Sequence, residues 1–433
     1  MAVYDANGTQ LNAVYGADGT QLCRAYDEDG NTIYQRQTII IPTGEYSTQI
    51  GYLSDWMINL ATYTANSKPY VKERYRMDNW SWVNGATAIA MAQAAWMYLN
   101  LWKHTNNSAY LTTARNLVTS LEEGRQQGGE FQMYVYNEGT GYDTAAYTGG
   151  NSEVPLYLFR MAELDTDNAQ TYITNALKSC DFLLSIQNSN GSWRVASNDQ
   201  TQTAMFTAQA VGALAMGCKY ANSNKRYLYR TAVEKGIAFI QTQLLADNRI
   251  RTCREVNQNT EYWRPPTSDQ AITIRGLAIA EYYLPNNENV SSWRTLRQTL
   301  LTYLNQCIGS EGSARNGLGT TNLPNDFYGL TDHVYTNPWA IEAYYYSALV
   351  DDSQSEINIS KGIADFCKGN LYFNVGNVNT NGTIRGAYNV QDDNWDTSAL
   401  TQDSSNEGGA EMIYVGWVTS PICSWMILYN ETE

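Results

Sequence analysis

Acidic residues in three polar segments could supply the two carboxyl groups that hydrolysis of a glycosidic bond requires. Asp392 and Asp393 are adjacent in the segment AYNVQDDNWDTS, Asp332 lies in GLTDHVYTNPW, and Asp143 lies in GTGYDTAAYTGGN. The reaction needs one protonated and one ionised carboxyl group. Because two buried, adjacent aspartates cannot easily ionise together, the Asp392 and Asp393 pair favours a raised pKa for one of them. We therefore predict that the catalytic carboxylates are drawn from these four residues.

These segments, and others like them, are also rich in aromatic residues. Flat rings offer apolar faces to the C–H faces of sugars, and neighbouring polar side chains can bond the hydroxyl groups. An arginine can add bidentate recognition of a carboxylate. The pattern predicts a concave site for a polysaccharide or a cell-surface glycan. The predicted substrate-binding residues are Trp80, Trp193, Trp263, Arg264, His333, Tyr335 and Trp395.

Two alternative functions use the same residues. His333 and Tyr335, with Arg264, would suit a lyase, in which a neutralised uronate is deprotonated and the C–O bond is eliminated. A non-catalytic glycan-binding adhesin would keep the aromatic residues but lack a working acid. A pair of carboxylates that face each other across the site would separate the hydrolase from the adhesin.

Alternating helices must position these segments. Periodicity predicts six apolar helices, each preceded by a more amphipathic helix. The apolar helices belong on the inside, because a helix that is apolar nearly all round needs cover on every face. The apolar helices are predicted to start near Asn84, Asn151, Thr201, Ser268, Asn337 and Gly409, and the amphipathic helices to span residues 48–65, 107–124, 168–187, 225–245, 290–308 and 354–371.

The recurring hairpins predict an all-α fold, an (α/α)6 toroid of six helical hairpins that spans residues 45–433. Each link from an apolar helix to the next amphipathic helix is short, which forces the two to be antiparallel. The longer loops then all lie on one face. We therefore expect a funnel whose mouth carries the acidic and aromatic residues.

A shorter repeat occupies residues 4–36, as YDANGTQLNAV, YGADGTQLCRA and YDEDGNTIYQR. Its Asn-Gly and Asp-Gly dipeptides accept the positive φ angles of two-residue hairpin turns. Residues 1–44 are therefore predicted to form a small N-terminal β meander. So short a sheet is marginal alone and should pack on another surface or chain.

Composition excludes several partners. The formal net charge is −15, whereas binding to nucleic acid or to an anionic membrane surface depends on clustered Lys and Arg. No apolar run is long enough for membrane insertion, and the start MAVYDANG lacks the features of a signal peptide. The seven cysteines and two histidines show neither a disulfide framework nor metal-ligand spacing, so no metal and no cofactor are predicted.

The N-terminal repeat resembles the YDxDG modules at the start of bacteriophage tail and appendage proteins. That resemblance implies that residues 1–44 attach an effector domain to the virion tail. It implies other virion tail proteins as partners and a homo-oligomer as the assembled form. It also implies synthesis in the host cytoplasm without a signal peptide.

The segment ALKSCDFLLSIQNSNGSW, Ala176 to Trp193, resembles the QW repeat of terpenoid cyclases and their toroidal relatives. In such a repeat the Gln and Trp stitch the end of an outer helix to the next turn, so the match supports the fold more than the chemistry. The spelling DDNWD at Asp392 also fits the DDxxD motif of terpene synthases, but it lies in a predicted loop rather than on a helix.

The Asp-Asp pair is also similar to a signature of α-mannanase-like glycosidases of the six-hairpin superfamily. Together these resemblances imply a phage-tail-like glycoside hydrolase that degrades a surface or capsular polysaccharide by carboxylate acid and base catalysis.

Overall fold

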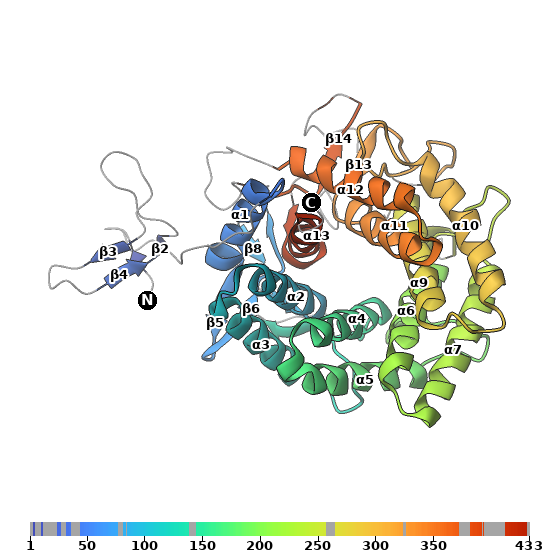
Figure 1. Ribbon diagram of the computed structural model, residues 1–433, viewed down its shortest axis with the longest axis horizontal. Helices are drawn as coiled ribbons and strands as arrows, with labels where there is room; N and C mark the ends of the chain where they lie inside the picture. Colours follow the sequence, from blue (N-terminus) through green and yellow to red (C-terminus); the bar gives the residue numbers. More distant parts are fainter. Residues whose placement is uncertain are drawn as a thin grey trace.

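The computed structural model describes residues 44–76, 81–83, 85–137, 144–256, 265–323, 326–371, 382–391, 393 and 412–430, with four short strands before residue 44. Its helices form two concentric rings (Figure 1). The inner helices are α2 (Ala88–Thr105), α4 (Thr148–Leu164), α6 (Ala204–Tyr220), α9 (Pro266–Tyr283), α11 (Asn337–Asp351) and α13 (Ser420–Asn430). The outer helices are α1 (Ser47–Trp56), α3 (Ser108–Glu123), α5 (Ala169–Ser185), α7 (Ser223–Gln241), α10 (Val290–Gln306) and α12 (Gln354–Gly369).

The rings close on themselves. Each inner helix packs against its inner neighbours, and each of the first five also packs against the outer helix that follows it in the chain. The last inner helix, α13, packs against α2 and α1, which joins the end of the chain to its first hairpin (Figure 1). The predicted (α/α)6 toroid is therefore confirmed.

Five inner helices begin close to their predicted starts, the largest difference being Asn84 against Ala88. The sixth does not, because α13 begins at Ser420 rather than near Gly409. A strand, β15 (Met412–Tyr414), and a π-helical turn (Val415–Thr419) come first. The strand pairs with β7 (Arg74–Arg76), which in turn pairs with β8 (Ser81–Val83), so pairing across the ring closure holds this segment extended.

The first outer helix is also shorter than predicted. It ends at Trp56 and continues as a π-helical turn (Met57–Ala61). The chain then forms the hairpin of β5 (Thr62–Ala65) and β6 (Lys68–Val71), whose turn residues Asn66 and Ser67 have positive φ. Tyr and Thr in β5 favour a strand over the helical continuation that periodicity alone predicts.

Short strand pairs also brace the mouth of the ring. They join β9 (Gly85–Thr87) to β10 (Tyr134–Asn137), β11 (Arg194–Ala196) to β12 (Asp199–Gln202), and β13 (Leu330–Asp332) to β14 (Ala387–Asn389). All lie in connections from an outer helix to an inner helix, so the long loops do share one face, as predicted.

Two antiparallel hairpins are described in the N-terminal region. β1 (Val3–Tyr4) pairs with β2 (Gln10–Leu11), and β3 (Arg24–Tyr26) pairs with β4 (Thr32–Gln35). Their strands flank the predicted Asn-Gly and Asp-Gly turns. The middle turn of the meander lies outside the described residues. No described helix is long and apolar enough to cross a membrane.

The QW-like segment has the structural role that its resemblance implies. Gln187 donates to the carbonyl oxygens of Gly191 and Ala232, each at 2.9 Å, and Trp193 Nε1 donates to the carbonyl of Leu183 at 2.7 Å. These bonds tie the end of α5 to the next turn and to α7. The repeat therefore marks how neighbouring hairpins are joined.

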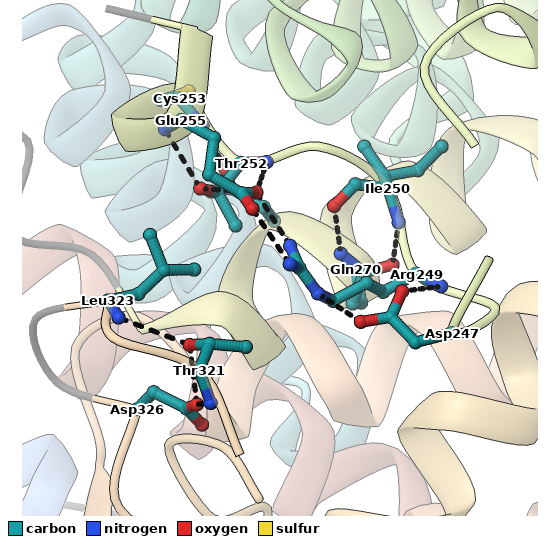
Figure 2. A network of polar contacts seen from close by, with 11 residues as sticks. Asp247, Arg249, Ile250, Thr252, Cys253, Glu255, Gln270, Thr321, Leu323 and Asp326 are labelled. Atoms are coloured by element: carbon teal, nitrogen blue, oxygen red, sulfur yellow. Dashed lines mark hydrogen bonds and ion pairs between the residues drawn. The ribbon is translucent and has the colours of Figure 1, made fainter. Parts of the chain in front are cut away.

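An amide clamp repeats around the ring. Gln270 on α9 accepts from the backbone N–H of Ile250 at 2.7 Å and donates to its carbonyl at 3.1 Å (Figure 2). Asn151 on α4 does the same to Phe131, at 2.7 and 2.9 Å. Each clamp joins the start of an inner helix to the buried loop residue before it. The loops are thus held by side chains of the helices they precede.

Replacing Gln270 with leucine is expected to cost about 3 kcal/mol of unfolding free energy. The apolar side chain leaves both buried backbone groups of Ile250 without a partner, and each such group costs roughly 1–3 kcal/mol. Urea denaturation of the purified variant measures the effect. Gln306→Leu is the matched control, since Gln306 is exposed and donates only to the carbonyl of Thr302; equal losses in the two variants would contradict the clamp.

Charged side chains meet at the centre of the inner ring. This ring-centre ion cluster comprises Glu153 and Arg160 of α4, Arg275 of α9 and Glu342 of α11. Arg275 contacts Glu153 and Glu342, each at 2.9 Å, and Arg160 contacts Glu342 at 2.9 Å. Burial opposes ionisation of Glu342, but the two arginines outweigh it and hold its pKa at about 2. The cluster therefore joins three inner helices by paired charges.

Candidate functional site

A cavity of about 310 Å³ opens at the N-terminal ends of α2, α4 and α6. It lies on the mouth side, where the connections into the inner helices meet. The connections that precede α2, α4, α11 and α13 all contribute lining residues, and helix α6 contributes Phe206. Aromatic rings make up much of its wall: Phe131, Tyr134, Tyr147, Phe206, Tyr335, Tyr414 and Trp417. This matches the predicted concave site with aromatic walls.

Glu73 supplies a carboxylate to this cavity. Its side chain is buried, with 3% of the residue exposed. The hydroxyl of Tyr134 donates to Glu73 Oε2 at 2.7 Å, and Arg74 Nη1 lies 3.3 Å from Oε1. The backbone of Glu73 is fixed on both sides, since its N–H donates to Val83 and its carbonyl accepts from Val415. Strand pairing at the ring closure therefore holds this carboxylate in place.

Arg74 and Tyr134 both act as hydrogen-bond donors beside Glu73. Arg74 also donates to the hydroxyl of Tyr414 at 3.0 Å. Burial opposes the charge of Arg74, but Tyr414 and Glu73 outweigh it and raise the arginine pKa. Burial and the Glu73 carboxylate raise the pKa of Tyr134 far above its usual value. At neutral pH Arg74 is charged and Tyr134 is a protonated donor, so Glu73 is an acceptor held by two donors.

The first turn of α4 forms another side of the cavity. Gly149 and Gly150 line it, and free backbone N–H groups at a helix N-terminus favour bound anions. A Cβ atom at Gly149 would lie 3.0 Å from the Phe206 ring and 3.1 Å from Gln209 Oε1. That close approach leaves little room for a side chain, so glycine keeps the helix start open to the cavity.

Among the predicted substrate-binding residues, Tyr335 lines the cavity and its ring meets that of Trp417 at 6.3 Å, edge to face. Trp193 does not reach the cavity. Its side chain is fully buried, and its indole N–H donates to the carbonyl oxygen of Leu183. The prediction that Trp193 stacks on a sugar is wrong, because neither face of the ring is open to a ligand.

Asp332 and His333 lie in the turn before α11 and do not line the cavity. Asp332 Oδ1 accepts from the backbone N–H groups of Val334 and Tyr335, at 2.7 and 3.1 Å. Its carboxylate thus organises the turn, and its predicted catalytic role stays a prediction. Burial raises the pKa of Asp332 to about 8 despite these two bonds.

The ring of His333 is fully buried and stacks on Phe366 at 5.7 Å. Asn337 Nδ2 lies 3.3 Å from its Nδ1. Burial lowers the pKa of His333 to about 3, so the imidazole is neutral. Its predicted contact with substrate, in a hydrolase or in a lyase, is therefore wrong for this arrangement.

Of the other predicted site residues, the structure describes only Asp393. Asp393 is exposed and accepts from the Tyr388 hydroxyl at 2.9 Å, but it does not line the cavity. Outside the described residues lie Asp143, Asp392, Trp80, Trp263, Arg264 and Trp395, whose roles stay predictions. Glu73 and Arg74 were not predicted. The segment that holds them, KERYR, has no pattern that marks a site.

Within the described ranges, no group of three His, Cys, Asp or Glu side chains is placed to bind a metal ion. The cysteines of the same ranges are buried and form no disulfide there: Cys180, Cys218, Cys253, Cys307, Cys367 and Cys423.

Asp332 is expected to make stability depend on pH. Its folded pKa lies above its unfolded value near 3.8, so the folded state keeps a proton that the unfolded state loses. Stability should fall as pH rises from about 4 to about 8, by at most ~1.4 kcal/mol per pH unit. Asp332→Asn keeps an acceptor for the two N–H groups and should flatten this slope in urea denaturation. Asp167→Asn is the control, with an 89% exposed side chain; an unchanged slope in Asp332→Asn would contradict the assignment.

Comparison with solved structures identifies the fold. No protein-family model and no curated protein sequence matches the chain. A sugar epimerase from a ruminal bacterium superposes with a TM-score of 0.63 at 9% identity, over 88% of this chain and 99% of that one. A GH76 alpha-mannanase from Bacteroides thetaiotaomicron superposes with a TM-score of 0.60 at 10% sequence identity, over 89% of this chain and 95% of that one. A D-mannose isomerase superposes with a TM-score of 0.59 at 13% sequence identity, over 88% of this chain and 96% of that one.

The class of fold is thus the (α/α)6 toroid of six helical hairpins. The named structures that share it are proteins that act on carbohydrates. At these identities the likeness establishes the architecture only.

Proposed function

We propose that this chain is a glycoside hydrolase that cleaves a surface or capsular polysaccharide in the mouth cavity. The carrying observation is the buried carboxylate of Glu73, held by Tyr134 and Arg74 inside an aromatic-lined cavity of about 310 Å³. Aromatic walls with a few converging polar groups suit a sugar ring and its hydroxyl groups. The carbohydrate-active proteins that share the fold support the same class of substrate.

Glu73 is proposed as the nucleophilic or basic carboxylate of the reaction. Arg74 stays charged beside it and Tyr134 donates to it, so these two side chains orient its oxygens. In a hydrolase such a group acts as nucleophile or as the base that activates water. Tyr335 and Trp417 then provide ring faces for the sugar.

The second carboxylate, the acid, is proposed to be Asp143, with Asp392 as the other candidate. Asp143 precedes Tyr147, a lining residue, by four positions, and four residues of chain span at most about 14 Å. That reach covers the distances of roughly 5–10 Å that separate paired carboxylates in glycosidases. Trp80, Trp263, Arg264 and Trp395 are proposed as further glycan contacts.

Residues 1–44 are proposed to attach the toroid to a virion tail, with other tail proteins as partners and a homo-oligomer as the assembled form. The repeated hairpins around Asn-Gly and Asp-Gly turns support a small modular attachment element. Light scattering of the full chain and of residues 45–433 tests this: loss of oligomers on truncation supports attachment through the module, and identical masses argue against it.

The test of the reaction is incubation of the full chain with bacterial capsular, cell-wall and plant polysaccharides. New reducing ends without ultraviolet absorbance from an unsaturated product would establish hydrolysis. Unsaturated products would instead indicate a lyase. Tight binding with no product from any polymer would favour the adhesin and remove the catalytic role of Glu73.

A further inference from the structure

A second hollow lies far from the mouth, at the C-terminal end of α9 and the N-terminal end of α7. Its volume is about 340 Å³. The lining comes from the first turns of α7, from Tyr283, and from the link Leu284 to Asn287. The mouth lies at the other ends of the inner helices, and α9, with 18 residues, is about 27 Å long. This hollow is therefore separate from the proposed catalytic cavity.

The hollow is positively charged on a strongly acidic protein. Its lining contains Arg226 and Arg230 and no acidic residue, whereas the chain carries a net charge of −15. Helix α7 begins at Ser223, in the same lining, and the positive end of its dipole adds to the field. The charge of this site suits an anion.

Its two arginines are arranged differently. Arg226 is fixed, because Nε donates to the carbonyl of Cys218 at 2.9 Å and Nη2 to that of Ala221 at 3.2 Å. Arg230 has a side chain that is 50% exposed, and Glu234 lies 3.6 Å from its Nε. One guanidinium is thus oriented in advance, and the other is half exposed beside Glu234. The guanidinium N–H groups that those carbonyls do not use can donate to a carboxylate.

An exposed tyrosine completes the site. Tyr227 is 59% exposed, which is high for a large aromatic residue. The Arg230 guanidinium lies 5.8 Å from its ring. Asn286 also lines the hollow and brings an amide group that suits hydroxyl partners, whereas Asn287 donates to Glu234 at 2.7 Å. An aromatic face beside arginine and amide groups combines recognition of a sugar ring with recognition of its negative charge.

We propose that this hollow is a non-catalytic binding site for an acidic saccharide, with the uronate carboxylate on Arg226 and Arg230 and the sugar ring on Tyr227. Its position would let one stretch of an acidic polymer be held while another occupies the mouth. The proposal does not depend on the proposed hydrolysis, because no residue of the mouth cavity takes part.

The test is calorimetric titration of the full chain with tetragalacturonate and with a hyaluronan tetrasaccharide, compared with neutral cellotetraose and inorganic phosphate. We expect a uronate oligosaccharide to bind and cellotetraose not to bind. Arg230→Gln and Tyr227→Ala should each weaken binding about tenfold, the loss of one charged or ring contact. The matched controls are Arg294→Gln, with a 47% exposed side chain, and Tyr52→Ala, 45% exposed.

Three results would overturn the proposal: no binding of either uronate oligosaccharide at millimolar concentration, equal weakening by the control variants, or phosphate binding as tightly as the oligosaccharides. Thermal unfolding of each variant shows whether it is folded. Glu73→Gln, in the mouth, should leave this affinity unchanged. A protein that binds uronates but hydrolyses nothing would keep this site and reject the proposed function.

Discussion

Replacing Glu73 with glutamine is expected to slow glycan hydrolysis about a thousandfold. Glutamine keeps the shape of the side chain and an oxygen for the Tyr134 hydroxyl, but it can neither attack carbon nor accept a proton from water. Loss of such a group typically reduces the reaction rate by 10²- to 10⁴-fold. Initial rates of reducing-end release on the polymer found by the substrate screen, with kcat and KM determined separately, measure the effect. The reduction should appear in kcat, because the charge is needed in the transition state.

Two further variants define what the Glu73 result means. Tyr134→Phe removes the bond of 2.7 Å to Glu73 and should cost about tenfold, the weight of one hydrogen bond to a charged group. Glu123→Gln changes a carboxylate with a 47% exposed side chain, paired with Lys68, and should not change the rate. A Glu73→Gln protein that is folded and retains at least a third of the wild-type kcat would show that the catalytic carboxylates lie elsewhere.

Replacing Arg275 with methionine is expected to destabilise the protein by about 3–5 kcal/mol. Arg275 is 1% exposed and lies between Glu153 and Glu342 of the ring-centre ion cluster. Its guanidinium also lies 4.7 Å from the ring of Trp339. Removing one partner leaves a buried charge without compensation, which is the costly way to break such a group. The unfolding free energy from guanidinium chloride denaturation measures the loss.

A surface ion pair provides the control for this prediction. Lys219 and Glu163 contact at 2.7 Å, but their side chains are 48% and 47% exposed. Lys219→Met should therefore cost less than about 1 kcal/mol. If Arg275→Met were no more destabilising than Lys219→Met, the cluster would not hold the inner ring together, and packing of the apolar helices alone would account for it.

The helical rings could be predicted because their signals are local. Apolar residues cover every face of α6 from Ala204 to Tyr220, and the structure buries that helix almost completely. Gln187 and Trp193 likewise make the stitch that their QW-like context implies. Periodicity failed where strands replaced helix, in the local hairpin at Thr62–Ala65 and in the long-range pairing at Met412–Tyr414.

Residue types predicted the kind of site but not its members. Trp193, Asp332 and His333 have the chemistry expected of a glycan site, yet all three are enclosed by the loops they occupy. Glu73 has no distinguishing neighbours in sequence. It becomes a site residue because β7 and β15, more than three hundred residues apart in the chain, pair beside it. Contacts between segments so far apart in the chain cannot be predicted from the spacing of residues in the sequence.

The sequence by itself determined the alternation of inner and outer helices, their antiparallel order and the face that carries the long loops. Those features follow from hydrophobic periodicity and link length, which are properties of neighbouring residues. Only the tertiary structure decided which loop residues reach the mouth cavity and which are buried beneath it. That choice depends on burial and hydrogen bonding across the closed ring, and both are set only when the first and last hairpins meet.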